Sequence, residues 1–196
     1  MTKKLIRPRG RPRKFDVDEA IATAQRLFHS RGYEAVSVSD VTDALGINTP
    51  SFYSAFQSKA GLYERVINRY ADHGAIPLAD ILRPDRPVVE CITAMLEEAA
   101  RRYATDPAAT GCIVLEGCRC SDEEARAVAR AAHVAAVEVI RTYIAARHSL
   151  DAPQLTEYIS TLMIGLSAQA RAGKGQDTLL ETVRIASLAV ASTLRA

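Results

Sequence analysis

The stretch Ser37–Lys59, SVSDVTDALGINTPSFYSAFQSK, decides the fold of this chain. Ser37 and Asp40 have the spacing of a capping box, which predicts the start of a helix. An apolar stripe follows this helix until Gly46, which permits a tight turn because it has no side chain. A second, shorter helix begins after the turn. Two short helices around a glycine turn predict a helix-turn-helix, in which the second helix enters the major groove of DNA.

The second helix has its own start signals. Asn48 or Thr49 can cap it, and Pro50 is tolerated in its first turn because the missing amide would have no partner there. A helix of hardly two turns is not stable alone, so the neighbouring helices must hold it. Its short polar residues are then expected to face outward, among them Ser51 and Ser54.

The N-terminal segment, MTKKLIRPRGRPRK, carries seven Lys or Arg and no acid, which leaves 18 basic against 23 acidic residues in the rest of the chain. This asymmetry predicts a polyanionic partner for the arm. The sequence Pro8–Pro12 spells an AT-hook core, suited to the narrow minor groove of A·T-rich DNA. The alternative is a solvated tail that adds non-specific attraction. The candidate contacts in the arm are Arg7, Arg9, Gly10, Arg11 and Arg13.

The composition and the absence of targeting signals indicate an intracellular protein. Of its 196 residues 48% are hydrophobic, but no apolar run reaches the roughly 18–20 residues of a membrane span. The basic N-terminus lacks the apolar stretch of a signal peptide, so we expect a cytoplasmic protein without a membrane partner. The four cysteines are then expected to be thiols.

Helical periodicity continues along the whole chain, which predicts an all-α fold. We expect a basic disordered arm over 1–14, a helix-turn-helix DNA-binding domain over 15–59, and a helical regulatory and dimerisation domain over 60–196. The segment 76–87 contains three prolines and is expected to be a loop. The other expected helices run from Asp16 to Gly32, Ser58 to about His73, about Val88 to Tyr103, about Ala109 to Cys118, and Ser121 to about Arg147. Ser121 is expected to cap the last of these in a capping box with Glu124.

The last two helices each carry an apolar stripe, and small residues lie beside the first stripe. They could complete the core of the chain itself, or form a four-helix interface between two subunits. We favour the interface, because one helix-turn-helix contacts too little DNA, whereas a two-fold dimer presents two recognition helices. The predicted interface residues are Leu155, Ile159, Leu162, Leu166, Val183, Ala186 and Val190.

The pattern GINTPSFYSAFQSK resembles the recognition-helix signature of the TetR family of transcriptional regulators. Over about residues 15–70 the resemblance is specific. Further on, GLSAQARAGKGQDTLL is similar to the break between the dimerising helices in a branch that often begins with a basic arm. The resemblance implies a homodimer that binds a near-palindromic double-stranded DNA operator, usually as a repressor. It also implies release from DNA when a small-molecule effector enters the C-terminal domain.

The resemblance also assigns DNA contacts by position. Phosphate contacts fall on Ser37, Thr49, Tyr53 and Lys59, and the places nearest base edges are Thr49, Pro50 and Ser51. Pro50 and Ala55 depart from the residues usual at their positions, so one customary backbone contact is not expected here. The full predicted set outside the arm is Ser37, Asn48, Thr49, Pro50, Ser51, Tyr53, Ser54 and Lys59.

If the regulatory domain has the family's arrangement, an effector pocket lies among its helices. The polar candidates give the most information about a ligand site. A buried polar group is normally hydrogen-bonded, and in an empty site its partner can be missing. Each candidate also fits an ordinary core position. The predicted lining is Tyr70, Met95, Tyr103, Cys112, Glu116, His133, Val137, Met163, Leu166 and Gln169.

The cysteines Cys112, Cys118 and Cys120 form the one cluster that could carry chemistry. Gly111-Cys112 resembles the thiol position of an electrophile-responsive member of the family. The alternatives are a structural role for these cysteines, or soft-metal binding with His133. The sequence contains no phosphate-binding glycine loop, metal helix or nucleophile motif, so we expect no enzyme, no cofactor and no metal site. A ligand-independent protein that coats A·T-rich DNA remains a further alternative.

Overall fold

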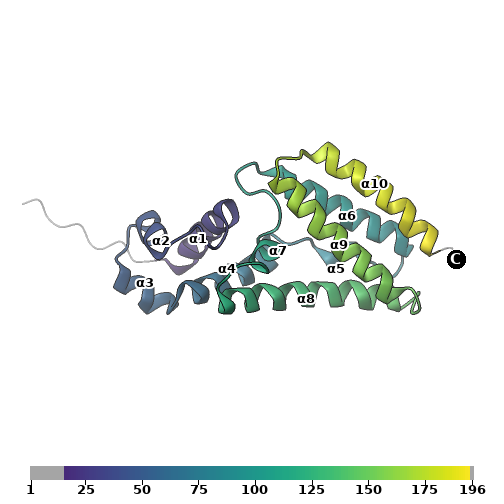
Figure 1. The fold of residues 1–196 in the computed structure, drawn as a ribbon. Coiled ribbons are helices and arrows are strands. Elements are labelled where there is room, and N and C mark those ends of the chain that lie inside the picture. The colour runs from purple at the N-terminus through teal and green to yellow at the C-terminus, as the bar shows by residue number, and fades with distance from the viewer. Residues whose placement is uncertain (1–15, 195–196) are drawn as a thin grey trace, which may run out of the picture.

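The computed structural model describes residues 16–194, and every regular element in this range is a helix (Figure 1). The molecule is elongated, with α2 and α3 at one end and α10 near the other. This arrangement confirms the all-α fold. The helices are α1 (Val17–Arg31), α2 (Val38–Leu45), α3 (Thr49–Phe56), α4 (Lys59–His73), α5 (Leu78–Ile81), α6 (Val88–Thr105), α7 (Ile113–Gly117), α8 (Glu123–Ala145), α9 (Ala152–Arg171) and α10 (Gln176–Thr193).

The helices α1 to α3 form a head whose ends follow the sequence signals. Asp16 caps α1 by accepting hydrogen bonds from the amides of residues 18 and 19, at 2.9 and 3.2 Å. The capping box of Ser37 and Asp40 starts α2. Gly46 ends α2 in the left-handed conformation, with φ at 63°, where a side chain would be strained. The turn that sets the angle between α2 and α3 therefore depends on this glycine.

Helix α4 joins the head to the rest of the chain. The Ser58 hydroxyl caps it by accepting a hydrogen bond from the amide of Gly61, at 2.8 Å. Along its length, Leu62, Tyr63 and Val66 are buried, and the helix packs against both α1 and α8. One apolar core therefore runs without interruption from the head into the body.

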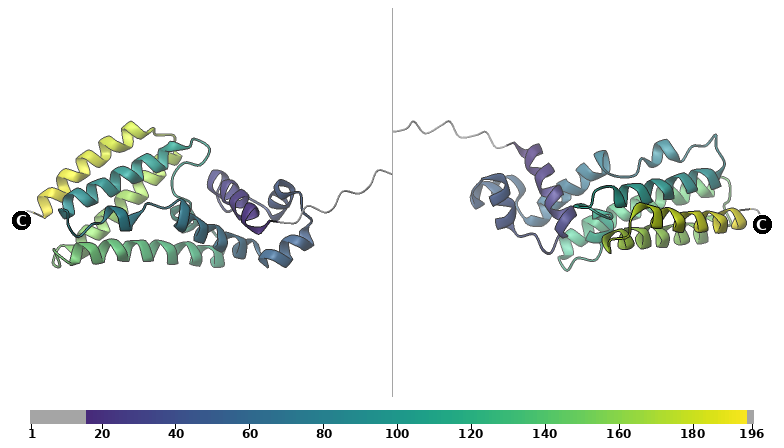
Figure 2. Two further views of the ribbon diagram at one scale, coloured as in Figure 1. Left: turned by 180° about the vertical axis from the view of Figure 1, so that it is seen from behind. Right: turned by 90° about the horizontal axis from the view of Figure 1, so that it is seen from above.

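The body is a bundle of long helices. In the two views of Figure 2, α10 lies along α6, and α9 lies beside α6 and α8. The buried side chains come from the apolar stripes that the sequence predicts for these helices. No helix between residues 16 and 194 is long and apolar enough to cross a membrane.

Three local expectations were wrong. The expected loop 76–87 contains the short helix α5, and the helix expected from Ala109 is reduced to the five residues of α7. Gly111 stops it, because its φ of +75° is not helical and it packs against Ser167. Asp122, not Ser121, caps α8, since the Ser121 amide and hydroxyl both donate to Glu34 of the head.

Candidate nucleic-acid interface and regulatory cavity

Helix α3 presents a polar, exposed surface at one end of the molecule. Phe52 and Phe56 hold it from below, with 0% and 2% of their surface exposed and their ring centroids 5.5 Å apart. Eight residues do not make a stable helix alone, so these two rings position the exposed side chains. The residues that the sequence assigned to DNA and that the structure brings together on this surface are Asn48, Thr49, Pro50, Ser51, Tyr53 and Ser54.

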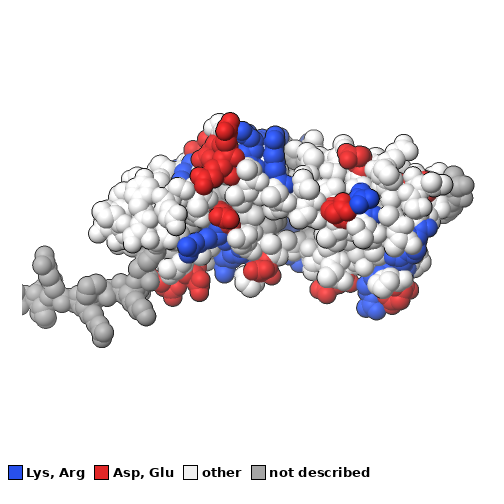
Figure 3. All heavy atoms as spheres, turned by 90° about the horizontal axis from the view of Figure 1, so that it is seen from below, with Lys and Arg blue, Asp and Glu red and all other residues white. Residues whose placement is uncertain are grey.

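The surface around α3 has little charge of its own. No Asp, Glu, Lys or Arg lies between Asp43 and Lys59, and in Figure 3 the end of the molecule that holds α3 is uncoloured. The Asn48 Oδ1 atom accepts a hydrogen bond from the Ser51 amide at 2.9 Å, so part of this side chain serves the helix cap. The groups that α3 offers to a partner are therefore hydroxyls, apolar carbon atoms and the Asn48 amide nitrogen, and apolar carbons suit contacts such as those to thymine methyl groups.

The Ser37 hydroxyl is occupied within the head. It donates a hydrogen bond to the Asp40 carboxylate, and it accepts one from the Asp40 amide at 3.0 Å. These bonds, together with Arg31 at 2.9 Å, hold the pKa of Asp40 well below its usual range. The ionised carboxylate beside Ser37 is unfavourable for a phosphate. A phosphate contact by this hydroxyl therefore requires the cap to rearrange.

Lys59 lies at the junction of head and body. Its Nζ atom is 4.0 Å from the centroid of the Tyr33 ring, and burial lowers its pKa. The Tyr33 hydroxyl donates a hydrogen bond to Asp122 at 2.5 Å, which ties the head to the start of α8. In this position Lys59 stabilises the junction through its contact with the Tyr33 ring. The predicted contacts in the arm, Arg7 to Arg13, lie outside the described residues.

A second contact between head and body involves His29 of α1. Its Nε2 atom lies 3.1 Å from the carbonyl oxygen of Gly111, and burial lowers the pKa of the imidazole, which favours the neutral form as donor. Arg171 of α9 donates to the His29 carbonyl at 3.2 Å and lies 3.4 Å from Glu116. The segment before α7 is therefore fastened to the head.

The body encloses a cavity of about 450 Å³ between α4, α8 and α9, next to α7. This volume falls within the range of about 300–1,000 Å³ typical of small-molecule sites. Asn68 and Ala71 of α4 and Ala135 and Val139 of α8 line it and are exposed, so it opens to solvent between these two helices. The cavity is therefore accessible to a molecule from outside.

Six of the ten residues predicted for the effector pocket line this cavity. Burial lowers the pKa of His133, and the Tyr70 hydroxyl lies 3.7 Å from the Cys112 sulfur atom. Sequence reasoning missed Thr156 and Ser160, which lie one turn apart on α9 and also line the cavity. The sequence feature that could have revealed them is a pair of hydroxyl side chains within the apolar stripe of α9. The six predicted residues that line the cavity are Tyr70, Tyr103, Cys112, His133, Val137 and Met163.

The other four predicted pocket residues lie elsewhere. Met95 and Leu166 are 0% and 3% exposed and belong to the packed core. Glu116 lies at the head–body contact and pairs with Arg119 at 3.0 Å, while Gln169 is exposed on α9. These four residues do not line the cavity, because periodicity gives a helix face but not which neighbouring helix covers it.

The seven residues predicted for the dimer interface instead face the interior of their own chain. Leu155, Ile159 and Leu166 of α9 and Val183, Ala186 and Val190 of α10 are at most 3% exposed, and Leu162 is half-buried against the same core. The stripes turn inward because α6 packs against both helices. These two stripes therefore complete the core of their own chain, which is the alternative to an interface between subunits.

Other apolar side chains on α9 and α10 are exposed. Ile164 is 44% exposed, and Ile185 and Leu188 are 58% and 64% exposed. Gly165 and Ala168 are also exposed on α9, and a Cβ built on Gly165 would meet no described atom within 4 Å beyond its chain neighbours and its own helix backbone. Exposed large apolar side chains on two neighbouring helices are candidates for a surface that another protein covers. We refer to Ile164, Gly165, Ala168, Ile185 and Leu188 as the outer face.

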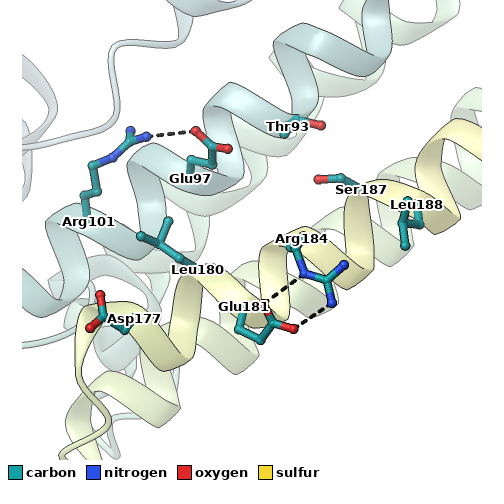
Figure 4. A pocket seen from close by; sticks show the side chains of 9 residues that line it. All are labelled: Thr93, Glu97, Arg101, Asp177, Leu180, Glu181, Arg184, Ser187 and Leu188. Atoms are coloured by element: carbon teal, nitrogen blue, oxygen red, sulfur yellow. Dashed lines mark hydrogen bonds and ion pairs between the residues drawn. The ribbon is translucent and has the colours of Figure 1, made fainter.

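An open groove of about 570 Å³ lies between α6 and α10, and Leu188 is at one end of it (Figure 4). Arg101 pairs with Glu97 at 2.8 Å, and Arg184 pairs with Glu181 at 2.7 Å. These two ion pairs are exposed to water, and the carboxylate of Asp177 also lines the groove. The groove therefore borders the outer face and lacks the enclosed, apolar lining of the cavity.

All four cysteines are free thiols. Burial is the main cause that raises the pKa of the Cys118 and Cys120 thiols, which disfavours the reactive thiolate. The described part of the chain has no cluster of three or more His, Cys, Asp or Glu that could hold a metal ion.

Comparison with known proteins identifies the family of this chain. The sequence model described as bacterial regulatory proteins, tetR family, matches residues 20–66. The HTH-type transcriptional repressor BdcR of Escherichia coli (strain K12) is 50% identical over 194 residues, which cover 99% of this chain and 98% of that protein. The HTH-type transcriptional repressor ComR of the same organism is 26% identical, with 88% of each chain covered.

The fold agrees with a solved structure of a DNA complex. A cysteine mutant of the TetR family transcriptional regulator CifR, complexed with 26-base-pair double-strand operator DNA, superimposes with a TM-score of 0.82. It is 29% identical in sequence, and the match covers 92% of this chain and 99% of that one. The chain belongs to the TetR family of bacterial regulatory proteins and is a DNA-binding transcriptional regulator of the helix-turn-helix type.

Proposed function

We propose that the protein is a cytoplasmic homodimeric repressor that binds a near-palindromic operator through α3 and leaves it when a small molecule enters the cavity. The observation that carries the proposal is the exposed polar surface of α3, held by Phe52 and Phe56 at one end of the molecule. Repression is supported by the 50% identity to BdcR, which is a transcriptional repressor. Operator binding is supported by the likeness to CifR on operator DNA.

The outer face supports dimerisation. A second copy that covers Ile164, Ile185 and Leu188 would remove three large apolar side chains from water. The face lies on the last two helices, far along the molecule from α3, so two heads would remain free to reach the DNA (Figure 1). A two-fold arrangement would present two copies of α3 to the two halves of an inverted repeat.

Release would act through α4. Ile67, Tyr70 and Ala71 of this helix line the cavity, while two residues at its other end separate it from α3. A second connection runs through Cys112, which lines the cavity next to the Gly111 carbonyl held by His29. A ligand shifts the equilibrium by its preference for the released form, and a hundredfold preference corresponds to about 2.7 kcal/mol.

The division of the chain follows this scheme. Residues 15–59 would read DNA, residues 60–196 would bind the effector and the second subunit, and residues 1–14 would add a basic arm. The arm would place Arg9 and Arg11 in an A·T-rich minor groove beside the operator.

Removal of residues 1–14 is expected to lower operator affinity and flatten its salt dependence. The segment carries seven basic residues, and the slope of log affinity against log salt falls by about 0.9 for each phosphate that they would neutralise. Fluorescence anisotropy at several salt concentrations measures this slope. Replacement of Arg9 and Arg11 alone by alanine should weaken binding most on A·T-rich flanks. Equal losses on G·C-rich flanks would identify a plain electrostatic tail.

Selection from a random DNA library, followed by footprinting of the enriched sequences, tests the proposed function. An inverted repeat protected by two protomers is the expected result. Extended protection of A·T-rich DNA without a defined boundary would indicate the coating protein instead. Failure to enrich any sequence would contradict both.

One observation supports a second possible trigger of release from DNA, the modification of a thiol. Cys112 lines the cavity, so an electrophile that enters there could modify its thiol. Electrophile-induced release that persists unchanged in Cys112→Ser would exclude this trigger.

A further inference from the structure

We infer that the cavity takes an uncharged, largely apolar molecule with one hydrogen-bonding group, and that this group meets the α9 hydroxyls of Thr156 and Ser160. The inference rests on the proposed function in treating the cavity as the effector site, and it adds the chemical class of the effector.

The first argument is charge. None of the described residues that line the cavity is Asp, Glu, Lys or Arg. Burial lowers the pKa of His133 and raises the pKa values of Tyr70 and Tyr103, so these three groups are neutral near pH 7. A carboxylate or ammonium ion would leave water without meeting an opposite charge, which is strongly unfavourable. The lining therefore selects against both anions and cations.

The second argument is an unpartnered hydroxyl. Thr156 is 3% exposed, and its Oγ1 atom has no hydrogen-bond partner among the described residues. Ser160 lies one helical turn further along α9 and also lines the cavity. Buried polar groups are nearly always hydrogen-bonded, so a hydroxyl left without a partner points to a group that an occupant supplies. The α9 side is thus the polar end of the site.

The third argument is the remaining surface. Apart from the polar groups already named, the lining consists of aliphatic side chains, Met163, Cys112 and Asn68, the last at the mouth. About 450 Å³ is room for a chain or ring system as well as the polar group. The aliphatic walls provide the affinity, and the α9 hydroxyls orient the molecule. The main aliphatic walls are Ile67, Ile76, Leu78, Val114, Leu115, Val137 and Ile140.

A matched series of nine-carbon probes tests the class. Calorimetric titration of the full-length protein would compare 1-nonanol, nonane, nonanoate and nonylammonium at pH 7.5. The alcohol is expected to bind at least tenfold more tightly than either ion. It should also bind roughly 2- to 12-fold more tightly than nonane, the equivalent of one hydrogen bond of about 0.5–1.5 kcal/mol. Equal affinities for the alcohol and an ion, or no binding of the alcohol, would overturn the inference.

Thr156→Val tests the polar end, because it keeps the shape of the side chain and removes the unpartnered hydroxyl. The variant should lose the preference for 1-nonanol over nonane while its affinity for nonane stays the same. Ser160→Ala provides a second test if the first variant folds poorly. Thr182→Val is the matched control, since Thr182 is exposed on α10 and donates to the Thr178 carbonyl. An unchanged preference in both cavity variants would contradict the role of the α9 hydroxyls.

Operator binding is measured separately, so the two proposals can fail independently. Binding of 1-nonanol that leaves the protein on its operator would support the ligand class and contradict ligand-controlled release. Release by nonanoate with no response to 1-nonanol would support control from the cavity and overturn the ligand class.

Discussion

Replacement of Ile185 and Leu188 by aspartate is expected to give a folded monomer whose operator affinity is at least 100-fold lower. Both side chains are more than half exposed on α10, so the substitutions should leave the core intact. They would, however, place two charges in the proposed contact between subunits, where each would lose water without a partner. Loss of the second head removes the avidity of two linked binding sites, typically about 10²- to 10⁴-fold.

Sedimentation velocity and operator anisotropy measure the two parts of this prediction, and circular dichroism reports folding. Val183→Asp on the same helix is the control, because Val183 is 2% exposed and packs inside its own chain. That variant should lose folding altogether, since it buries an unpaired charge. If Ile185→Asp/Leu188→Asp remained a dimer with full affinity, the outer face would not be the dimer interface.

Phe52→Ala is expected to lower the free energy of unfolding by about 3–5 kcal/mol, the usual cost of a large cavity in a packed core. Phe52 is fully buried and is one of two rings that hold α3 to the head. Operator binding should be lost as well, because the exposed side chains of α3 would no longer be held in place. Urea denaturation measures the stability, and anisotropy on the selected operator measures the binding.

The neighbouring residue provides the matched control for this prediction. Tyr53 is 49% exposed and shares the same helix, so Tyr53→Ala should change stability little while it weakens DNA binding. Equal loss of stability in the two variants would contradict the assignment of Phe52 as the anchor and Tyr53 as the DNA-facing residue.

The head could be predicted almost completely from the sequence. Its helix ends depend on local chemistry, such as the Ser37 and Asp40 capping box and Gly46, and local chemistry is legible in sequence. The cap of α8 was misplaced by one residue because Ser121 bonds to Glu34, a contact between residues 87 positions apart. Such a contact depends on the tertiary fold, and no local pattern reveals it.

The body was predicted less well for a related reason. A helical stripe identifies which side chains are buried, as for Val183 and Val190, but burial by the chain itself and burial by a second copy give the same pattern. Of the residues predicted for the pocket, those on α4 and α8, such as Tyr70 and His133, line the cavity, whereas Met95 belongs to the core. Which neighbouring helix leaves a gap is decided by packing in three dimensions.

The central claim is that a molecule in the cavity controls the hold of α3 on DNA. It is tested most directly by titration of 1-nonanol into the complex of protein and selected operator, with wild type compared to Ala136→Phe. Ala136 lines the cavity, and a phenyl ring there would fill part of it while the DNA-binding head is untouched. The account predicts that 1-nonanol releases wild type from the operator, whereas Ala136→Phe binds the operator normally and stays bound. Release of both proteins at the same concentration, or of neither although calorimetry shows wild type to bind the alcohol, would contradict it.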